Sequence, residues 1–479
     1  MPVGVEEVEV AVVGAGPGGL ASAVTLGAYG VETLVLERRL SPSTLPRANA
    51  ASTGTMELMR RWGLEQAARE RSLDVEFQAL ATPTLAAAGE GQAIDVGFPT
   101  RDQAGLVSPT APASIGQDDL EPLLEARASE LPGTTIERGV ELLSMTPRAC
   151  GGYALALAGP AGGRTVHARY VIGADGMRST VRQELGIAIE DSGSLAERLG
   201  IRFRAPLWDL LGEHRFVIYF ITGGNEDRAL IPAGKPDRWV FAISWDETPE
   251  AIENLSEVEL TNLVAGATGY PELPITVEQT FHTSYGVGLA QRFGDGDAFL
   301  IGDAAHRVTP RGATGLNTAI RDGFDIGWKL AWVLRDWAGP SLLDTYERER
   351  RPVAEFNAQR SSTEQGSIIG NGLGLAADIG GRVPHAWVER RGGLVSTLDL
   401  LGEGLTLFAG PDWDGSEPLT PGAAPMSVER IDAISARALC IPAGGSVLAT
   451  PDGRPVAMTQ GREPAGVLPG TASGEAVPV

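Results

Sequence analysis

Several residue types and segments are scarce in this 479-residue chain, and each scarcity excludes a class of protein. Cys150 and Cys440 are the only cysteines and lie far apart, which excludes a disulfide framework, a Cys-x-x-Cys zinc site and a dithiol redox centre. No apolar run approaches the ~20 residues that span a bilayer, and the N-terminus has no signal-peptide pattern. We therefore expect a cytoplasmic protein with no membrane partner and no metal site.

The chain is also poor in positive charge. Lysine occurs only at Lys235 and Lys329, and 61 acidic residues face 39 basic ones. The net charge of −22 argues against nucleic acid as a partner. An anionic cofactor would therefore need a locally built positive site. The length predicts two or three domains.

A glycine-rich turn follows an apolar run near the N-terminus. The run begins at Val8 (VEVAVV), and Gly14, Gly16 and Gly19 then give the G-x-G-x-x-G spacing before a helical segment. In a βαβ unit these glycines permit a tight turn, a close approach to a pyrophosphate and close packing of the helix on the strand. A second strand, VETLVLE, ends at Glu37, whose carboxylate suits a ribose hydroxyl. The unit predicts a dinucleotide site without distinguishing NAD from FAD.

Two later strand ends favour FAD. The strand in YVIGADG ends at Asp175 and Gly176, and the strand in DAFLIGD ends at Gly302 and Asp303. A simple NAD-dependent dehydrogenase has no need for a second strand-Gly-Asp element as far downstream as Gly302. An extended FAD does need one, because its flavin half reaches well beyond the first βαβ unit.

A long helix is predicted after the second Gly-Asp pair. It begins at Gly315, Leu316 and Asn317. The first turn of a helix has backbone N–H groups without intrahelical partners, and these suit the flavin edge that gains negative charge on reduction.

In this order, the three motifs resemble those of the class A flavoprotein aromatic hydroxylases, the p-hydroxybenzoate and phenol hydroxylase superfamily. The likeness is closest to the FAD monooxygenases that tailor aromatic polyketides, and it continues through LLDTYERERRPVAEFN and the C-terminal SVLATPDGRPVAM. It implies an α/β protein with a Rossmann-like FAD-binding domain, an inserted antiparallel substrate sheet and a C-terminal thioredoxin-like domain without Cys-x-x-Cys. The expected segments are 1–75, 101–185 and 285–370 for FAD, 76–100 and 186–284 for the substrate sheet, and 380–479 for the C-terminal domain.

The resemblance also implies roles for single residues. Glycines 14, 16 and 19 would face the pyrophosphate, with Glu37 at the adenosine ribose and Asp303 at the ribityl chain or pyrophosphate. Further expected FAD neighbours are Arg47, Gln117, Asp175, Gly176, Gly302, Gly315, Leu316 and Asn317, and the expected catalytic environment comprises Pro310 beside flavin C4a, Leu316, Asn317 and, for orienting or deprotonating a phenol, Tyr219 and Tyr285.

The substrate pocket is the least determined part. Phe216, Tyr219, Phe220, Trp239 and Trp245 alternate with polar residues in the predicted sheet. They either line a pocket for a flat aromatic substrate or fill the core of the sheet.

The family implies that NAD(P)H reduces FAD, that O2 adds to it, and that the resulting C4a-hydroperoxyflavin hydroxylates a phenolic or polycyclic aromatic substrate. A Baeyer–Villiger or epoxidising enzyme on the same scaffold is the alternative, and a non-catalytic flavin-binding protein is a further one. A flavin-dependent halogenase is disfavoured, since no WxWxIP segment is present. We expect a monomer or a homodimer.

Several local features depart from the family pattern or supplement it. Gly54 stands where an arginine is frequent, GATG (312–315) replaces the usual GGQG, and residues 366–381 are expected to form a flexible connector. His306 is expected to brace the loop after Gly302 and Asp303. Plausible phosphate contacts are Arg38, Arg39 and Arg178.

Overall fold

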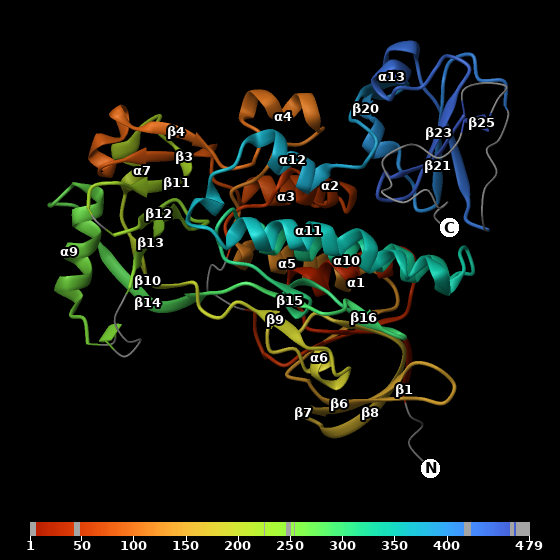
Figure 1. Cartoon of the computed structure of the whole chain (residues 1–479), viewed down its shortest axis with the longest axis horizontal. Helices are drawn as coiled ribbons and strands as arrows, with labels where there is room; N and C mark the ends of the chain where they lie inside the picture. The colour runs from red at the N-terminus through yellow and green to blue at the C-terminus, as the bar shows by residue number, and fades with distance from the viewer. Residues whose placement is uncertain are drawn as a thin grey trace.

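The computed structural model describes residues 6–42, 48–224, 226–245, 251–252, 254–415, 423–459 and 464–465. Figure 1 shows a central sheet with helices over it, a second sheet at one end of the molecule and a C-terminal sheet at the other.

The central sheet consists of parallel strands rich in small and β-branched apolar residues. Its strands, in spatial order, are β17 (Ala298–Leu300), β8 (Gly162–Gly173), β1 (Glu6–Val13), β2 (Thr33–Glu37) and β5 (Thr134–Arg138). Val12 of β1 lies opposite Val35 of β2 on one side and Ile172 of β8 on the other. Antiparallel strands extend the sheet: β16 (Gly294–Asp295) pairs with β17, and β7 (Tyr153–Gly159) joins β8 to β6 (Glu141–Pro147).

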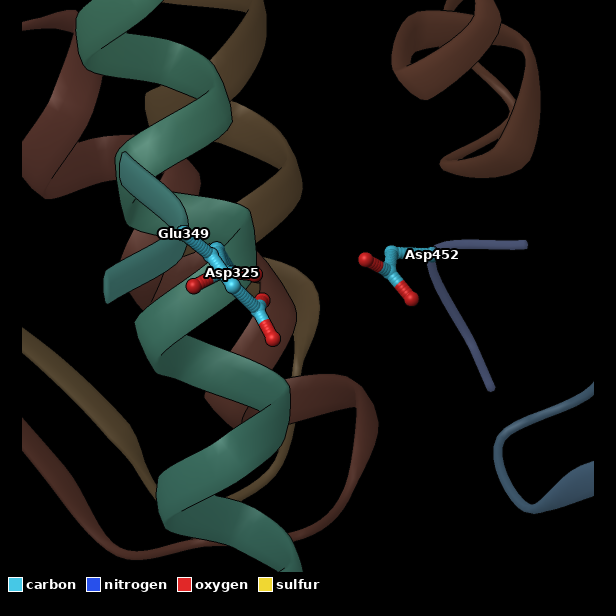
Figure 2. A group of neighbouring side chains, drawn as sticks. All are labelled: Asp325, Glu349 and Asp452. Carbon is cyan, nitrogen blue, oxygen red and sulfur yellow. The ribbon is translucent and has the colours of Figure 1, made fainter. Parts of the chain in front are cut away.

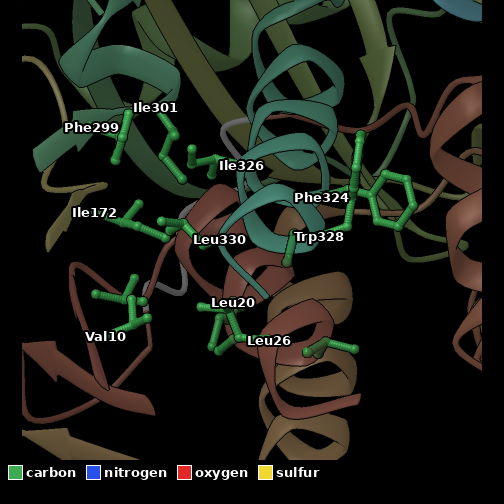
Figure 3. Close-up of a cluster of buried hydrophobic side chains, with 14 of the residues drawn as sticks. Val10, Leu20, Leu26, Ile172, Phe299, Ile301, Phe324, Ile326, Trp328 and Leu330 are labelled. Atoms are coloured by element: carbon green, nitrogen blue, oxygen red, sulfur yellow. The ribbon is translucent and has the colours of Figure 1, made fainter. Parts of the chain in front are cut away.

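Two helices cover this sheet in direct contact with each other. In Figure 3, Leu20 and Leu26 of α1 (Pro17–Ala28) meet Ile326 and Leu330 of α10 (Gly315–Leu334) in one buried cluster that also holds Val10 of β1. Glycines bring the two backbones together, because a Cβ at Gly323 would lie 2.3 Å from the carbonyl oxygen of Gly18. Further helices around the sheet are α5 (Gln117–Glu130), α6 (Thr180–Glu184) and α11 (Thr345–Ser361).

The second sheet has seven strands: β14 (Thr276–Tyr285), β10 (Ala196–Arg204), β13 (Arg238–Ser244), β12 (Arg228–Pro232), β11 (Phe216–Ile221), β3 (Glu76–Thr82) and β4 (Gln92–Asp95). It is antiparallel except where β11 runs parallel to β3, so the predicted antiparallel sheet is a mixed one. Its buried cluster includes residues of α7 (Leu207–Leu211), α9 (Glu257–Thr268) and the 3₁₀ turn η1 (Leu85–Glu90).

The C-terminal part forms its own sheet and small core around Phe408. Its elements are the hairpin β19 (Trp387–Arg390) and β20 (Gly393–Ser396), then β21 (Leu405–Ala409), β22 (Met426–Arg430), α13 (Ala433–Ala438), β23 (Ser446–Ala449), β24 (Pro455–Thr459) and β25 (Pro464–Ala465). β21 is parallel to β22 and antiparallel to β23. A tight turn at Pro451 joins β23 to β24, which pair as an antiparallel hairpin.

Short elements connect these parts. They are α2 (Thr53–Arg61), α3 (Glu65–Glu70), α4 (Arg101–Val107), α12 (Asn371–Ile379), β9 (Ile189–Asp191), β15 (Gly288–Ala290), β18 (His306–Arg307), η2 (Gly302–Ala304), η3 (Pro340–Leu342), η4 (Glu364–Ser367) and η5 (Thr397–Leu400). The expectation of a flexible connector over 366–381 is wrong, because this segment contains α12. Asp378 of α12 accepts hydrogen bonds from Ser52 and Gly54 at the start of α2.

The α/β fold is confirmed, with several sheets as predicted. Across the described residues, we find no helix that combines the length and the apolar character of a membrane span.

Candidate active site

A cavity of about 460 Å³ opens where the parallel strands of the central sheet end. Val13 of β1, Glu37 of β2, Ala174 after β8 and Ile301 after β17 all line it. The carboxyl ends of parallel strands are the usual ligand-binding edge of such sheets. On the far side the cavity reaches β11 and β12 of the second sheet.

The three glycines of the first turn have different surroundings. A Cβ on Gly14, whose φ is +109°, would lie 2.3 Å from the carbonyl oxygen of Ala174, and one on Gly19 would lie 2.0 Å from the carbonyl oxygen of Gly14. A Cβ on Gly16 would meet no atom within 4 Å. Gly16 lines the cavity, so a ligand can approach its backbone directly at the start of α1. This loop fits the pyrophosphate of a dinucleotide.

Glu37 holds that loop in place. Its carboxylate accepts hydrogen bonds from the backbone N–H of Ala15 and of Arg39, each at 2.9 Å. It also lines the cavity, together with Arg38 and Arg39, which supply positive charge beside the phosphate loop. A ribose contact by Glu37 stays a prediction.

The second Gly-Asp motif is fixed from behind by a buried ionic network. Gly302, at φ 56°, donates its backbone N–H to Asp322 Oδ2 at 3.2 Å, and the same oxygen lies 2.6 Å from His306 Nε2. Arg350 Nε donates to the other Asp322 oxygen at 2.7 Å. His306 therefore braces the loop through Asp322, while Asp303 lines the cavity.

The start of α10 borders the middle of the cavity. Gly315 and Leu316 line it, and the backbone N–H of Thr318 is the first to donate within the helix, to Thr314 at 2.8 Å. The preceding N–H groups have no intrahelical acceptor. Pro310 also lines the cavity here.

The side chain of Asn317 is engaged with protein partners, and its predicted place beside the flavin stays a prediction. Its Oδ1 accepts from the Ser52 backbone N–H at 2.8 Å and from Thr55 Oγ1 at 2.7 Å, while its Nδ2 donates to the Ala50 and Ala313 carbonyls. It clamps the start of α2 to α10 and is not among the residues that line the main cavity. Ala50, which it holds, does line the cavity.

Asp175 and Gln117 both reach the cavity but have protein partners. Asp175 Oδ2 accepts from the Thr180 and Val181 backbone N–H groups, at 2.6 and 3.2 Å, and burial raises the pKa of its carboxyl. It therefore caps α6, and Gly176 beside it has φ +79°. Gln117 Nε2 donates to Glu121 at 2.7 Å. The predicted FAD neighbour Arg47 lies outside the described residues.

The two tyrosines proposed for substrate do not line this cavity. Tyr219 is fully buried in the core of the second sheet, and its hydroxyl donates to the His214 carbonyl at 2.8 Å, so its predicted role is corrected to packing. Burial raises the pKa of Tyr219. Tyr285 lies between the guanidinium groups of Arg198 and Arg311, 5.7 and 6.0 Å from its ring centre, and burial raises its pKa too.

The apolar end of the cavity is mostly aliphatic. It is lined by Val96, Phe98, Val217, Ile218 and Ile231, and by none of the five aromatic residues proposed from the sheet pattern. Trp239, for example, is fully buried beside Trp208, with ring centres 4.6 Å apart. Sequence reasoning missed Val96 and Phe98, because no pattern in the neighbouring residues shows that this segment packs against loop 312–314.

A second ionic cluster lies further along α10 (Figure 2). Asp325, Glu349 and Asp452 place carboxylate oxygens within 4.8 Å of one another. Lys329 Nζ lies 2.7 Å from both Asp325 and Glu349, so an ammonium group already pairs with two of the three carboxylates. The cluster joins α10 and α11 to the β23–β24 turn.

Comparison with known proteins agrees with this geometry. Residues 7–361 match the family described as "FAD binding domain". A putative polyketide hydroxylase of Streptomyces halstedii is 33% identical over 461 residues, covering 85% of this chain and 82% of the relative. Aklavinone 12-hydroxylase of Streptomyces purpurascens is 34% identical, covering 85% of each chain.

Solved structures give the same result. The crystal structure of a ternary complex of aklavinone-11 hydroxylase with FAD and aklavinone superposes with a TM-score of 0.83 at 29% identity, over 96% of both chains. The rebeccamycin biosynthetic enzyme RebC with reduced flavin gives 0.78 at 27% identity, over 96% of this chain and 97% of the other. The chain therefore belongs to the FAD-binding family of flavin-dependent aromatic hydroxylases.

Proposed function

We propose that this protein uses FAD, NAD(P)H and O2 to hydroxylate a neutral polycyclic aromatic compound of the polyketide kind. The observation that supports this is the division of one cavity into two chemically different ends. The glycine loop, Glu37 and Arg38 form a charged end, whereas Phe98, Ile218 and their aliphatic neighbours form an apolar end. Gly315 and Pro310 lie between them, beside the expected position of the flavin ring.

The charged end fits FAD residue by residue. Gly16 leaves open space where the pyrophosphate would lie, and Glu37, Asp303 and the start of α10 line the cavity. With FAD bound, Glu37 would face the ribose, Asp303 the ribityl chain and the first N–H groups of α10 the flavin edge. Bound FAD would supply the redox chemistry that activates O2 with electrons from NAD(P)H. The protein positions the reactants and supplies donors where negative charge develops.

The apolar end indicates the class of substrate. The residues of β11 and β12 that line it, Val217, Ile218 and Ile231, carry no charge and no hydrogen-bonding side chain. A flat ring system gains free energy there by burying apolar surface. The relatives named as aklavinone hydroxylases and polyketide hydroxylases support the same substrate class.

The finer predictions belong to the same proposal. We infer a thioredoxin-like fold for 380–479, supported by its mixed sheet, with packing rather than redox chemistry as its role, since Cys440 has no second cysteine near it in the sequence. A cytoplasmic location and a monomeric or homodimeric state complete the proposal.

The test is reconstitution followed by turnover. The purified protein should take up FAD, turn yellow and oxidise NADPH or NADH faster when a polycyclic phenol is added, with a product heavier by one oxygen atom. NAD(P)H oxidation without an oxygenated product would favour a non-catalytic or uncoupled flavoprotein. An inserted ring oxygen or an epoxide in the product would favour the alternative oxygenation chemistries. Failure to bind FAD would overturn the proposal.

A further inference from the structure

Arg321 occupies space that any side chain at position 54 would need. Arg321 lies on α10, one turn after Asn317, and its guanidinium reaches the start of α2. A Cβ on Gly54 would lie 2.4 Å from Arg321 Nη1 and 2.8 Å from Asp378 Oδ1. Gly54 is therefore the residue that admits this guanidinium between α2, α10 and α12.

The charge of Arg321 is not neutralised by a direct partner. Among the residues that the structure describes, no carboxylate lies within 4.0 Å of it, and no hydrogen bond of its guanidinium is found. The acid nearest to it in this pocket, Asp378, already accepts from Ser52 Oγ and from the Gly54 backbone N–H, each at 2.8 Å. Arg321 is half-buried, and Asp378 is the acid that acts most strongly on its charge, so its placement beside this carboxylate calls for a role.

Arg321 lies on the side of loop 312–314 that faces away from the main cavity. Arg321, Asn317 and Asp378 line a small cavity of about 40 Å³ together with residues 312–314, and Arg350 and Arg360 line it too. Arg360 lies against the loop itself, since a Cβ on Gly312 would lie 2.6 Å from its Nη2, and Arg321 adds a second positive charge on this side. The opposite side of the same loop lines the main cavity. A cation here adds to the backbone donors at the start of α10, where negative charge on a reduced flavin would collect.

We infer that Arg321 is a positioning residue of the flavin site: it places a positive charge behind loop 312–315 and stabilises the carboxylate of Asp378, which together with Asn317 fixes the start of α2. The inference rests on the proposed FAD site. Under this inference, the position of the guanidinium matters, and the helix that carries it does not. A guanidinium delivered from position 54 should therefore replace one delivered from position 321.

Four variants test this: R321M, R321K, G54R and the double variant G54R/R321M, with R127Q as a control that removes an arginine paired with Glu130 on α5. We expect R321M to bind FAD about tenfold more weakly and to lower the flavin midpoint potential, because the reduced flavin loses a neighbouring cation. R321K should stay near the wild type in potential. G54R alone should unfold at lower temperature, because two guanidinium groups compete for one space.

The double variant decides the matter. Recovery of both the midpoint potential and the thermal stability, relative to G54R and R321M, supports the inference. An unchanged potential in R321M, or a double variant no better than G54R, overturns it. Thermal unfolding of the apoprotein measures the coupling between positions 54 and 321 without FAD, so a wild-type protein that binds no FAD would refute the proposed function separately.

Discussion

Two aspartates lie three residues apart on α10, both buried, and their surroundings are opposite. Asp322 has two basic side chains as neighbours, His306 at 2.6 Å and Arg350 at 2.7 Å. Asp325 shares Lys329 with Glu349 and lies close to Asp452. Burial alone would raise both pKa values. His306 and Arg350 instead lower the pKa of Asp322 to about 2, whereas burial raises that of Asp325 to about 6 against the attraction of Lys329.

The difference shows that burial does not determine the charge of a buried acid. The carboxylate of Asp322, which contacts a histidine and an arginine, stays ionised, and it fixes Gly302 beside the cavity. Three carboxylates around one ammonium group repel one another, so one of them retains a proton more readily. The network around Asp322 supports the Gly302-Asp303 turn. The network around Asp325 joins the β23–β24 turn of the C-terminal sheet to α10 and α11 (Figure 2).

The largest expected effect comes from D322N. The change leaves His306 and Arg350 without their shared anion in a fully buried place, which typically costs about 3–5 kcal/mol. Urea unfolding of the apoprotein should show this loss, and FAD affinity should fall because Gly302 loses the carboxylate that holds it. D325N is the matched control on the same helix. Equal effects of D322N and D325N would break the contrast between the two networks.

K329M should have a smaller effect. It removes the ammonium group from the acidic cluster, but protonation of Asp325 and the nearby Arg454 compensate in part, so we expect a loss of roughly 1–3 kcal/mol. FAD affinity should stay within about twofold, since Lys329 does not border the cavity. A K329M protein as unstable as D322N would show that compensation fails.

The pH dependence should separate the two acids. Asp322 has a lowered pKa in the folded state, so its stabilisation is present above its unfolded value of about 4 and is lost as pH falls towards 2. Asp325 has a raised pKa, so its contribution is full below about pH 4 and is lost as pH rises through about 6. Between pH 4 and 7 the wild type should lose about 3 kcal/mol relative to D325N, since each unit of the pKa difference corresponds to about 1.4 kcal/mol. Parallel stability curves for the two proteins would contradict the raised pKa.

R454M should have the smallest effect. Arg454 lies 3.2 Å from Asp452 and 3.7 Å from Glu349, and its side chain is 38% exposed, so solvent screens both pairs. We expect a loss below about 1 kcal/mol by urea unfolding. A larger loss would mean that Arg454, rather than Lys329, neutralises the cluster.

Local chemistry made the charged end of the site predictable from the sequence. The glycine turn, Glu37 and the start of α10 are each defined by residues close in the chain, and the structure places Glu37, Gly302 and Gly315 at one cavity. The fold class followed from the same motifs, because a βαβ unit requires a parallel sheet.

The rest depended on contacts that no local pattern encodes. The alternation of apolar and polar residues placed Tyr219 and Trp239 on one face of their strands. It did not show whether that face lines the cavity or fills the core, and both residues lie in the core of the second sheet. The hydrogen bonds of Asn317 to Ser52, and the fit of Arg321 beneath Gly54, join residues more than 260 positions apart. Only the packed structure shows that a glycine on one helix and an arginine on another depend on each other.

The glycines where α1 crosses α10 have a consequence for the geometry of the cavity. Gly18, Gly323 and Gly327 let the two backbones touch, so the relative placement of the helices depends on the main chain and not on compressible side chains. Both helices begin at the cavity, one at the phosphate loop and the other beside the expected flavin ring. The crossing thus fixes the separation of the two helix starts, so the backbone donors at both starts keep a set spacing along the cavity.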